Sequence, residues 1–361
     1  MLSLALQLDL LRFYKKIDEH TILKKTFLIQ PMLKSPEEYV NGILNQDRLT
    51  LARTITLIES TLPAHQELAR AIVNQLLPHT GKGIRIGITG VPGAGKSTYI
   101  ETFGTMLTEI GHKVAVLAID PSSSRSGGSI LGDKTRMEKL AVNPKAFIRP
   151  SPSSGTLGGV GRKTRETMLV CEAAGYDVVI IETVGVGQSE TTVSSMVDFF
   201  LVLMIAGAGD ELQGIKKGVL EVADAIVINK ADGDNVTRAE IAQKEYETAL
   251  HMLMPNSPNW TPPVLTCSSI NGEGIDRIWD TIKEHRTKLT DCGEMASKRK
   301  TQALDWMSFL LDDGLRQWFY NTPDVKKALN ELQKDVESKN TSPTAAADML
   351  LKFLPTIGSI D

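Results

Sequence analysis

The chain has 361 residues, of which 42% are hydrophobic and 23% are charged. This is the composition of a globular protein, and the length allows one large domain with additions or two domains. Lys and Arg number 40 against 43 Asp and Glu, so the formal net charge of -3 creates no overall field that attracts nucleic acid. We therefore expect no nucleic-acid partner.

The cysteines and histidines argue against two further classes. The three cysteines form no CxxC pair, and the six histidines form no HExxH motif. Neither a disulfide framework nor a built-in zinc site is therefore indicated. We expect a reducing, cytoplasmic environment for this chain.

Residues 1–31 are Leu-rich with helical spacing, but acidic residues interrupt the apolar run and no small-residue cleavage site follows it. The segment holds one Arg and four Lys against three acidic residues, whereas mitochondrial transit peptides are Arg-rich and poor in acids. It is interpreted as an extension, or as a misassigned start ahead of Met32. No apolar run reaches the roughly 18 residues that a membrane span needs, so we expect no membrane association.

The central part of the chain has the pattern of an α/β fold. From Ser35 to about Leu77, apolar residues three and four apart predict a helical hairpin that breaks at Pro63. Short β-branched runs then alternate with amphipathic segments, which predicts a mainly parallel sheet flanked by helices. The predicted strands are residues 84–89, 113–120, 146–150, 177–183, 198–206, 225–230 and 263–269. Helices are predicted to begin at Lys96, Lys163, Val236 and Gly274.

After this region the pattern becomes helical again, from Met295 to Asp361, with breaks at Pro323 and Pro343. We interpret these helices as an arm and not as a further core. The predicted organisation is an N-terminal helical segment at 1–80, an α/β domain at 81–290 and a C-terminal helical arm at 291–361.

A phosphate-binding loop follows the first predicted strand. Residues 90–97 match GxxxxGK(S/T) and lead directly into a helix, which is the P-loop arrangement. The glycines allow backbone N–H groups and the helix N-terminus to point at phosphate oxygens. Lys96 would reach the β and γ phosphates, and the Ser97 hydroxyl would bind Mg²⁺. A simple Gly-rich turn would not require this Lys–Ser pair, so we expect a P-loop NTPase fold.

A second motif indicates which base is bound. Asn229-Lys230-Ala231-Asp232 has the NKxD arrangement of GTP-binding proteins and ends a predicted strand. Asp232 can accept hydrogen bonds from the N1–H and the N2 amine of guanine, a donor pair that adenine lacks. Asn229 would brace the loop, and the Lys230 stem would lie over the ring. The alternative is a helix start that Asp232 caps.

The last predicted strand ends in Cys267, Ser268 and Ser269, where a GTPase presents a backbone N–H to the guanine O6. The alternative for Cys267 is a buried structural cysteine, and we expect its backbone to matter more than its thiol.

Acidic residues and glycines predict metal and γ-phosphate contacts. Glu182 follows a strand, its length suits a water-mediated hold on Mg²⁺, and Gly185 can offer its N–H to the γ-phosphate. A Ser/Gly-rich loop connects Asp120 to Asp133, and we favour a nucleotide-ordered switch over a connection without a fixed structure. Asp120 could instead cap the loop, and Asp133 could cap the next helix.

Two loop assignments remain open. No Gln directly follows Gly185, the position from which a Ras-like enzyme orients its water, and Gln188 lies too far along to take that role. Residues 207–217 are either a third switch or an ordinary strand-to-helix connection that Asp210 caps.

Five strings of the sequence, in this order and spacing, resemble the MeaB/ArgK family of P-loop GTPases. They are GVPGAGKST, DPSSSRSGGSILGDKTRM, ETVGVGQSE, GDELQGIKKG and NKAD, and the likeness runs from about residue 35 to 350. The resemblance implies a chaperone of an adenosylcobalamin-dependent acyl-CoA mutase, usually methylmalonyl-CoA mutase. In that family, GTP binding and hydrolysis gate cofactor loading and protect the cofactor. Mg²⁺, three switch loops and a homodimer through the C-terminal arm are also implied.

Residue by residue, the resemblance implies the following site. The phosphate-binding residues would be Gly90, Val91, Pro92, Gly93, Ala94, Gly95, Lys96, Ser97 and Thr98. Guanine would be bound by Asn229, Lys230, Asp232, Cys267, Ser268 and Ser269. The metal and the γ-phosphate would be served by Asp120, Asp133 and Glu182, with Gly185, Gln213 and Lys216 in the switch loops.

Several functional alternatives accompany this interpretation. The chain could be a binding module in which nucleotide occupancy matters and hydrolysis is only a timer. It could be a kinase or ATPase of Lys/Arg/ornithine transport, although the NKAD motif argues against adenine. Nickel-delivery GTPases share the Glu-type switch but carry His- or Cys-rich metal sites, which this sequence lacks. Without a water-orienting Gln or an arginine finger, we expect slow hydrolysis that the mutase stimulates.

Overall fold

The computed structural model describes residues 33–120, 137–152, 157–183, 189–207, 217–252 and 257–354. The chain forms two compact units, residues 1–76 and residues 77–361. The predicted division at residues 80 and 290 stays a prediction. None of the described helices combines the length and the apolar character that crossing a bilayer requires.

The described part of the N-terminal unit, from residue 33 on, contains three helices where the sequence predicts a hairpin. They are α3 (Pro36–Leu44), α4 (Arg48–Glu59) and α5 (Pro63–Leu76). The break at Pro63 is as predicted, whereas the break at 45–47 was missed because it contains neither Pro nor Gly. There Gln46 adopts a left-handed φ of 62°, and the Asp47 carboxylate accepts hydrogen bonds from the N–H groups of Leu49 and Thr50. Asp47 thus caps a new helix.

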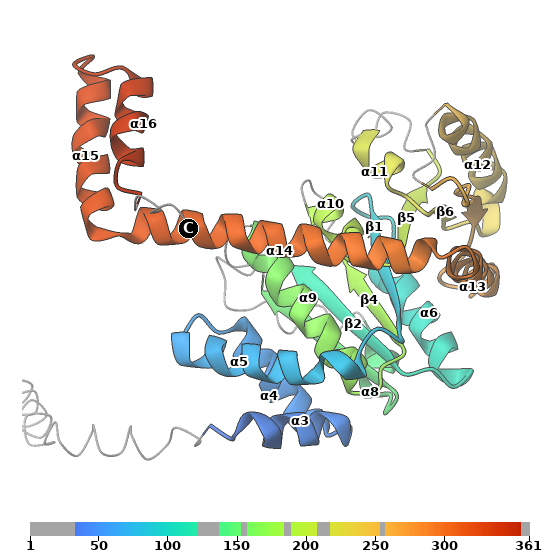
Figure 1. Ribbon diagram of the computed structural model, residues 1–361. Coiled ribbons are helices and arrows are strands. Elements are labelled where there is room, and N and C mark those ends of the chain that lie inside the picture. Colours follow the sequence, from blue (N-terminus) through green and yellow to red (C-terminus); the bar gives the residue numbers. More distant parts are fainter. Residues whose placement is uncertain are drawn as a thin grey trace, which may run out of the picture. The chain divides into compact units, whose positions relative to one another are not determined.

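The second unit is built on a seven-stranded sheet in the order β3-β2-β4-β1-β5-β6-β7 (Figure 1). Every pairing in it is parallel. Each predicted strand is confirmed. Their apolar runs are nearly continuous because helices cover both faces of the sheet. The strands are β1 (Ile84–Gly90), β2 (Val114–Asp120), β3 (Ala146–Pro152), β4 (Val178–Glu182), β5 (Phe199–Ile205), β6 (Ala225–Asn229) and β7 (Val264–Thr266).

Of the four helix starts predicted in the α/β region, those at Lys96, Val236 and Gly274 lie within one residue of the observed starts, and the fourth differs. Helix α9 starts at Leu157, six residues before Lys163, because three glycines in its first turns conceal the helical pattern. The connecting helices are α6 (Lys96–Glu109), α8 (Glu138–Val142), α9 (Leu157–Ala173), α10 (Ser189–Ser194), α11 (Lys217–Glu221), α12 (Val236–His251) and α13 (Ile275–Asp291). Two short 3-10 turns are η1 (Leu77–His79) and η3 (Gly233–Asn235).

The C-terminal region is helical, with both predicted breaks confirmed. It consists of α14 (Glu294–Asn321), α15 (Pro323–Glu337) and α16 (Pro343–Leu351). Proline occupies the first position of the last two helices, where its missing N–H costs no hydrogen bond. Helix α14 begins against α13 and continues past the sheet in Figure 1, and α15 packs on α16.

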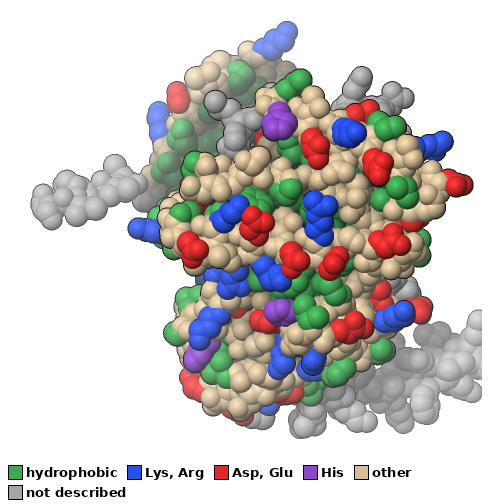
Figure 2. All heavy atoms as spheres, turned by 90° about the vertical axis from the view of Figure 1, so that its right-hand side faces the viewer, with side chains coloured by type: hydrophobic (Ala, Val, Ile, Leu, Met, Phe, Trp, Pro, Cys, Tyr) green, Lys and Arg blue, Asp and Glu red, His purple; other side chains and the backbone are tan. Residues whose placement is uncertain are grey.

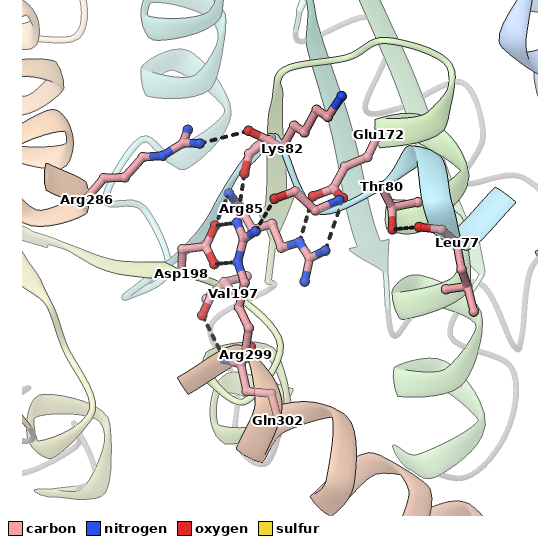
Figure 3. Close-up of polar contacts among 12 residues, drawn as sticks. Leu77, Thr80, Lys82, Arg85, Glu172, Val197, Asp198, Arg286, Arg299 and Gln302 are labelled. Atoms are coloured by element: carbon pink, nitrogen blue, oxygen red, sulfur yellow. Dashed lines mark hydrogen bonds and ion pairs between the residues drawn. The ribbon is translucent and has the colours of Figure 1, made fainter. Parts of the chain in front are cut away.

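Buried ion pairs close the amino-terminal edge of the sheet (Figure 3). Arg85 at the start of β1 pairs with Glu172 of α9 through two bonds of 2.7 and 3.0 Å. Arg299 of α14 pairs with Asp198, next to the start of β5, through bonds of 2.7 and 2.6 Å. Two-bond arginine–carboxylate pairs of this kind fix orientation as well as position. The first pair attaches α9 to the base of the sheet, and the second attaches α14.

The face shown in Figure 2 carries Lys, Arg, Asp and Glu side chains of both signs, interspersed with single apolar groups. No large patch of one sign is visible on that face. Exposed single apolar residues are normal for a protein surface.

Candidate functional site

The predicted site residues follow β1, β4, β6 and β7. Because these strands are parallel, their carboxyl ends meet at one edge of the sheet, which is where α/β proteins bind ligands. This edge is opposite the ion pairs of Figure 3.

The loop after β1 has the backbone that a phosphate cradle needs. Gly90 has a φ of 154°, and a Cβ there would overlap the carbonyl oxygen of Leu203. Gly95 adopts a left-handed φ of 85° at the start of α6, whose first turn is not capped by a side chain. The N–H groups of that turn are thus available to an anion. Within the loop, Val91 and Ala94 are buried, while Pro92, Gly93 and Thr98 are exposed.

Lys96 turns back over this loop. Its Nζ donates to the carbonyl oxygens of Gly90 at 2.8 Å and Val91 at 3.3 Å. Burial lowers the pKa of the Lys96 ammonium, and the nearby carboxylates of Glu182 and Glu190 act in the opposite direction. A half-buried cation is thereby held over the cradle.

Ser97 and Glu182 provide hard oxygen ligands beside Lys96. The Ser97 hydroxyl donates to Glu182 Oε1 at 3.2 Å, and Glu182 is buried at the end of β4. Magnesium prefers such oxygens and usually uses only one or two protein carboxylates together with phosphates and water. The described residues therefore fit a magnesium ion. Asp120 ends β2, the strand beside β4, at the same edge of the sheet.

Asn229 connects the phosphate loop to the predicted base-binding loop. Its Nδ2 donates to the carbonyl oxygen of Ala94 at 2.8 Å. Its Oδ1 accepts from the backbone N–H of Ser269 at 3.1 Å and from the Ser269 hydroxyl at 2.7 Å. Both polar atoms of the side chain are therefore hydrogen-bonded, and the side chain is buried. It fixes two loops that are far apart in the sequence.

Asp232 is held by a hydroxyl and does not cap a helix. Ser268 Oγ donates to Asp232 Oδ2 at 2.5 Å. The Asp232 side chain makes no capping bond to η3, which starts at the next residue, so the capping alternative is not supported. The neighbouring Lys230 is exposed with a left-handed φ of 59°, which leaves its stem available to cover a base.

Cys267 behaves as a structural thiol. It is buried, its Sγ lies 3.4 Å from Asn229 Oδ1, and burial raises its pKa to about 12. The thiol is therefore protonated at neutral pH. The backbone N–H groups of Cys267 and Ser268 donate to Ile228 and Glu273 carbonyls, whereas that of Ser269 donates to a side chain. Ser269 can thus turn to a guanine O6 without breaking a backbone pairing.

Four predicted residues lie outside the described part of the chain. They are Asp133, Gly185, Gln213 and Lys216. The alternatives weighed for the loops around them also concern residues that the structure does not describe.

The structure adds residues that the motifs did not indicate. The Thr183 hydroxyl donates to Thr89 Oγ1 at 2.7 Å and ties the ends of β1 and β4 together. Thr102 of α6 donates to the carbonyl oxygen of Ser269 at 2.6 Å. Glu190 is buried at the start of α10 and acts electrostatically on Lys96. Thr183 and Glu190 both belong to one of the motif strings, ETVGVGQSE, and so could have been singled out, whereas Thr89 and Thr102 lie outside all of the strings.

A parallel sheet, a P-loop at the end of β1 and an NKxD loop braced against it define the class of P-loop GTPases. Comparison with known proteins narrows the class to a family. The family model described as Methylmalonyl Co-A mutase-associated GTPase MeaB matches residues 51–324. GTPase ArgK of Escherichia coli is 49% identical over 319 residues, which cover 88% of this chain and 96% of that protein.

Two further proteins are similar over most of their length. The methylmalonic aciduria type A homolog, mitochondrial, of Mus musculus is 45% identical over 351 residues, covering 91% of this chain and 85% of that protein. A crystal structure described as LAO/AO transport system kinase is 42% identical with a TM-score of 0.72, covering 88% of this chain and 97% of that one. The chain belongs to the MeaB family of P-loop GTPases.

Proposed function

We propose that this chain binds GTP with Mg²⁺, hydrolyses it slowly, and uses the cycle to serve an adenosylcobalamin-dependent acyl-CoA mutase. The observation that carries the nucleotide part is the position of Asn229. One amide side chain bonds both to the P-loop at Ala94 and to the loop of Ser269, so the phosphate and base sites are built as one unit.

Guanine selection rests on Asp232. With Ser268 holding one carboxylate oxygen, the other can face the N1–H and N2 amine of guanine. Adenine offers no such donor pair, and a buried acceptor left unpaired is costly. This argues against the transport-kinase alternative, which requires adenine.

Hydrolysis would be performed by electrostatic positioning. Lys96 would leave its two carbonyl acceptors for phosphate oxygens, and Gly185 would offer its N–H to the γ-phosphate. Ser97 and Glu182, with Asp120 and Asp133, would hold the metal, which neutralises charge on the phosphates when bound.

The expected partner is a methylmalonyl-CoA mutase or a related acyl-CoA mutase. This proposal draws on the name of the matching family, which includes that mutase. Nucleotide state would gate the loading and protection of the mutase cofactor, with Gln213 and Lys216 in the coupling loop. The three cysteines of the chain are all unpaired, which supports placing this activity in the cytoplasm.

We further propose that residues 291–361 form a dimerisation arm beside a nucleotide-binding domain at 81–290 and a helical segment at 1–80. Helix α14 has an exposed apolar face beyond its contact with the sheet. Its members, spaced three and four residues apart, are Leu304, Met307, Leu311, Leu315 and Trp318. Such spacing places them along one side of the helix, where the same face of a second copy can cover them.

The test is the GTP turnover of the purified chain with Mg²⁺, alone and with increasing amounts of methylmalonyl-CoA mutase. We expect slow turnover alone and a rate that rises and saturates as the mutase is added. A rate that stays constant while the two proteins form a complex would overturn the partner proposal. Glu182→Ala then separates the two modes of action, because protection of the mutase by this variant would mean that occupancy alone suffices.

A further inference from the structure

The first turns of α14 hold a short segment, residues 195–198, that connects α10 to β5. Lys298 Nζ donates to the carbonyl oxygen of Asp198 at 2.8 Å. Gln302 Nε2 donates to that of Val197 at 2.9 Å (Figure 3). The Asp198 carboxylate is buried and accepts the two-bond pair from Arg299. It also accepts from the backbone N–H of Arg85, so Asp198 is fixed to both α14 and the sheet.

Arg165 of α9 makes the remaining connection between this segment and α14. Its Nη2 donates to the carbonyl oxygen of Ser195 at 2.7 Å, and its Nη1 donates to that of Gln302 at 2.7 Å. The guanidinium carbon lies 5.1 Å from the ring centre of Trp306, also on α14. One side chain therefore joins α9, the end of α10 and the backbone of α14.

This arrangement is unusual for a half-buried cation. Burial and, to a smaller extent, the nearby Arg85 lower the pKa of Arg165 to about 10, while Asp305 acts in the opposite direction. The guanidinium is still charged at neutral pH, yet within the described part of the chain its hydrogen bonds go to carbonyls and not to carboxylates. Two carbonyls can separate at a smaller cost than a buried ion pair. The Arg165 contacts are thus the adjustable ones, and the Arg299 pair is the fixed one.

Helix α10 connects the segment that Arg165 contacts to the carboxyl-terminal edge of the sheet, where the P-loop lies. It begins at Ser189, directly after the residues around Gly185, and has fewer than two turns. Its Val193 packs against β1, since a Cβ at Gly87 would lie 2.9 Å from Val193 Cγ1. Gly87 is three residues before Gly90, the first residue of the P-loop. A short, tightly packed helix passes a displacement of one end to the other.

We infer that Arg165 is a positioning residue that couples the nucleotide state of the site to α14, by joining the carbonyl of Ser195 to the backbone of α14. This inference rests on the proposed GTP-dependent function. A shift of α10 that accompanies γ-phosphate binding would move Ser195 relative to the fixed Asp198. Arg165 would then pull on α14 through Gln302 and Trp306, so that the arm senses which nucleotide is bound.

The test is amide hydrogen exchange of the full chain, measured by mass spectrometry with Mg²⁺ and either GDP, guanylyl imidodiphosphate or no nucleotide. In the wild type, peptides from α14 around residues 298–310 should exchange differently in the GDP and triphosphate-analogue states. Arg165→Met should lose most of this difference while keeping the nucleotide protection of P-loop peptides. Arg162→Met is the matched control, because Arg162 lies on the same helix and pairs with Glu166, four residues along α9. It should match the wild type.

The outcomes separate this inference from the proposed function. Protection of the P-loop without any difference at α14 in the wild type overturns the coupling alone. The coupling is also overturned if α14 peptides of Arg165→Met differ in exchange between the GDP and triphosphate-analogue states as much as those of the wild type. If nucleotide does not slow the exchange of P-loop peptides, the proposed function is contradicted, and the coupling, which rests on it, is contradicted too. If Arg165→Met fails to fold, Arg165→Lys replaces it, since a single ammonium cannot span both carbonyls in a fixed fork and should also reduce the difference.

Discussion

A single hydroxyl controls the carboxylate on which guanine selection depends. Ser268 Oγ lies 2.5 Å from Asp232 Oδ2 and also accepts from the backbone N–H of Asn271 at 3.2 Å. Removing it in Ser268→Ala should weaken GDP binding about tenfold, because a hydrogen bond to a charged group contributes about 1.5 kcal/mol or more. Calorimetric titration measures this effect. Thr287→Ala removes an exposed helix hydroxyl and serves as control. Equal affinities of both variants would show that Asp232 is positioned without Ser268.

At the scale of single residues, the sequence predicts which residues belong to the site better than it predicts which residues they contact. The P-loop and the NKxD motif are contiguous, so their residues can be found without a structure. The bonds from Asn229 to Ala94 and from Thr102 to Ser269 join positions more than 100 residues apart. No local pattern encodes such pairs, because they result from the order in which the strands assemble.

At the scale of an element, the turn from β1 into the P-loop depends on one glycine. A Cβ at Gly90 would overlap the backbone of Leu203, a group that cannot move aside without disturbing β5. We expect Gly90→Ala to lower the free energy of unfolding by about 3 kcal/mol. Gly93→Ala is the matched control, since Gly93 also has a positive φ but no atom within 4 Å of the added group. It should cost about 1 kcal/mol. Equal losses in urea unfolding would contradict this account.

The junction of α13 and α14 with the sheet depends on a buried carboxylate. Asp224 accepts from the backbone N–H of Phe200 at 2.8 Å and lies 3.5 Å from Lys298 Nζ and 3.6 Å from His285 Nε2. Burial raises its pKa, but Lys298, His285 and the Phe200 N–H together outweigh burial and leave the pKa of Asp224 lowered. The carboxylate therefore contributes stability above its unfolded-state pKa of about 3.9, and this contribution is lost as the pH falls below it.

Asp224→Asn should accordingly lower the free energy of unfolding by about 2 to 4 kcal/mol at neutral pH. The difference from the wild type should shrink as the pH falls below about 4. Asp280→Asn, which removes an exposed ion pair with Lys283, should have little effect at any pH. A loss for Asp224→Asn that does not change with pH would show that packing, and not charge, explains it.

The elements themselves were predictable wherever periodicity is strong. All seven strands and the breaks at Pro63, Pro323 and Pro343 follow from hydrophobic runs and prolines. The start of α9 and the break at 45–47 were not predicted, since tertiary packing tolerates glycines in a helix and an N-cap residue such as Asp47 can begin a new helix without a preceding Pro or Gly.

At the scale of the whole molecule, the exposed apolar face of α14 predicts self-association. Leu311 and Leu315 lie one turn apart on that face and are both exposed. The double variant Leu311→Asp, Leu315→Asp should be monomeric in sedimentation velocity at concentrations where the wild type is a dimer, because unpaired charges in an apolar interface are costly. Val142→Asp, at another exposed apolar position, should remain dimeric. A monomeric wild type would contradict the arm's proposed role.

Guanine-specific nucleotide binding is the claim on which every other part of this account depends. The most direct test is calorimetric titration of the full chain with GDP and then with ADP in the presence of Mg²⁺, repeated with Asp232→Ala. The account predicts tight GDP binding, little ADP binding, and loss of GDP binding in the variant. Comparable binding of ADP by the wild type would contradict it and would favour the transport-kinase alternative.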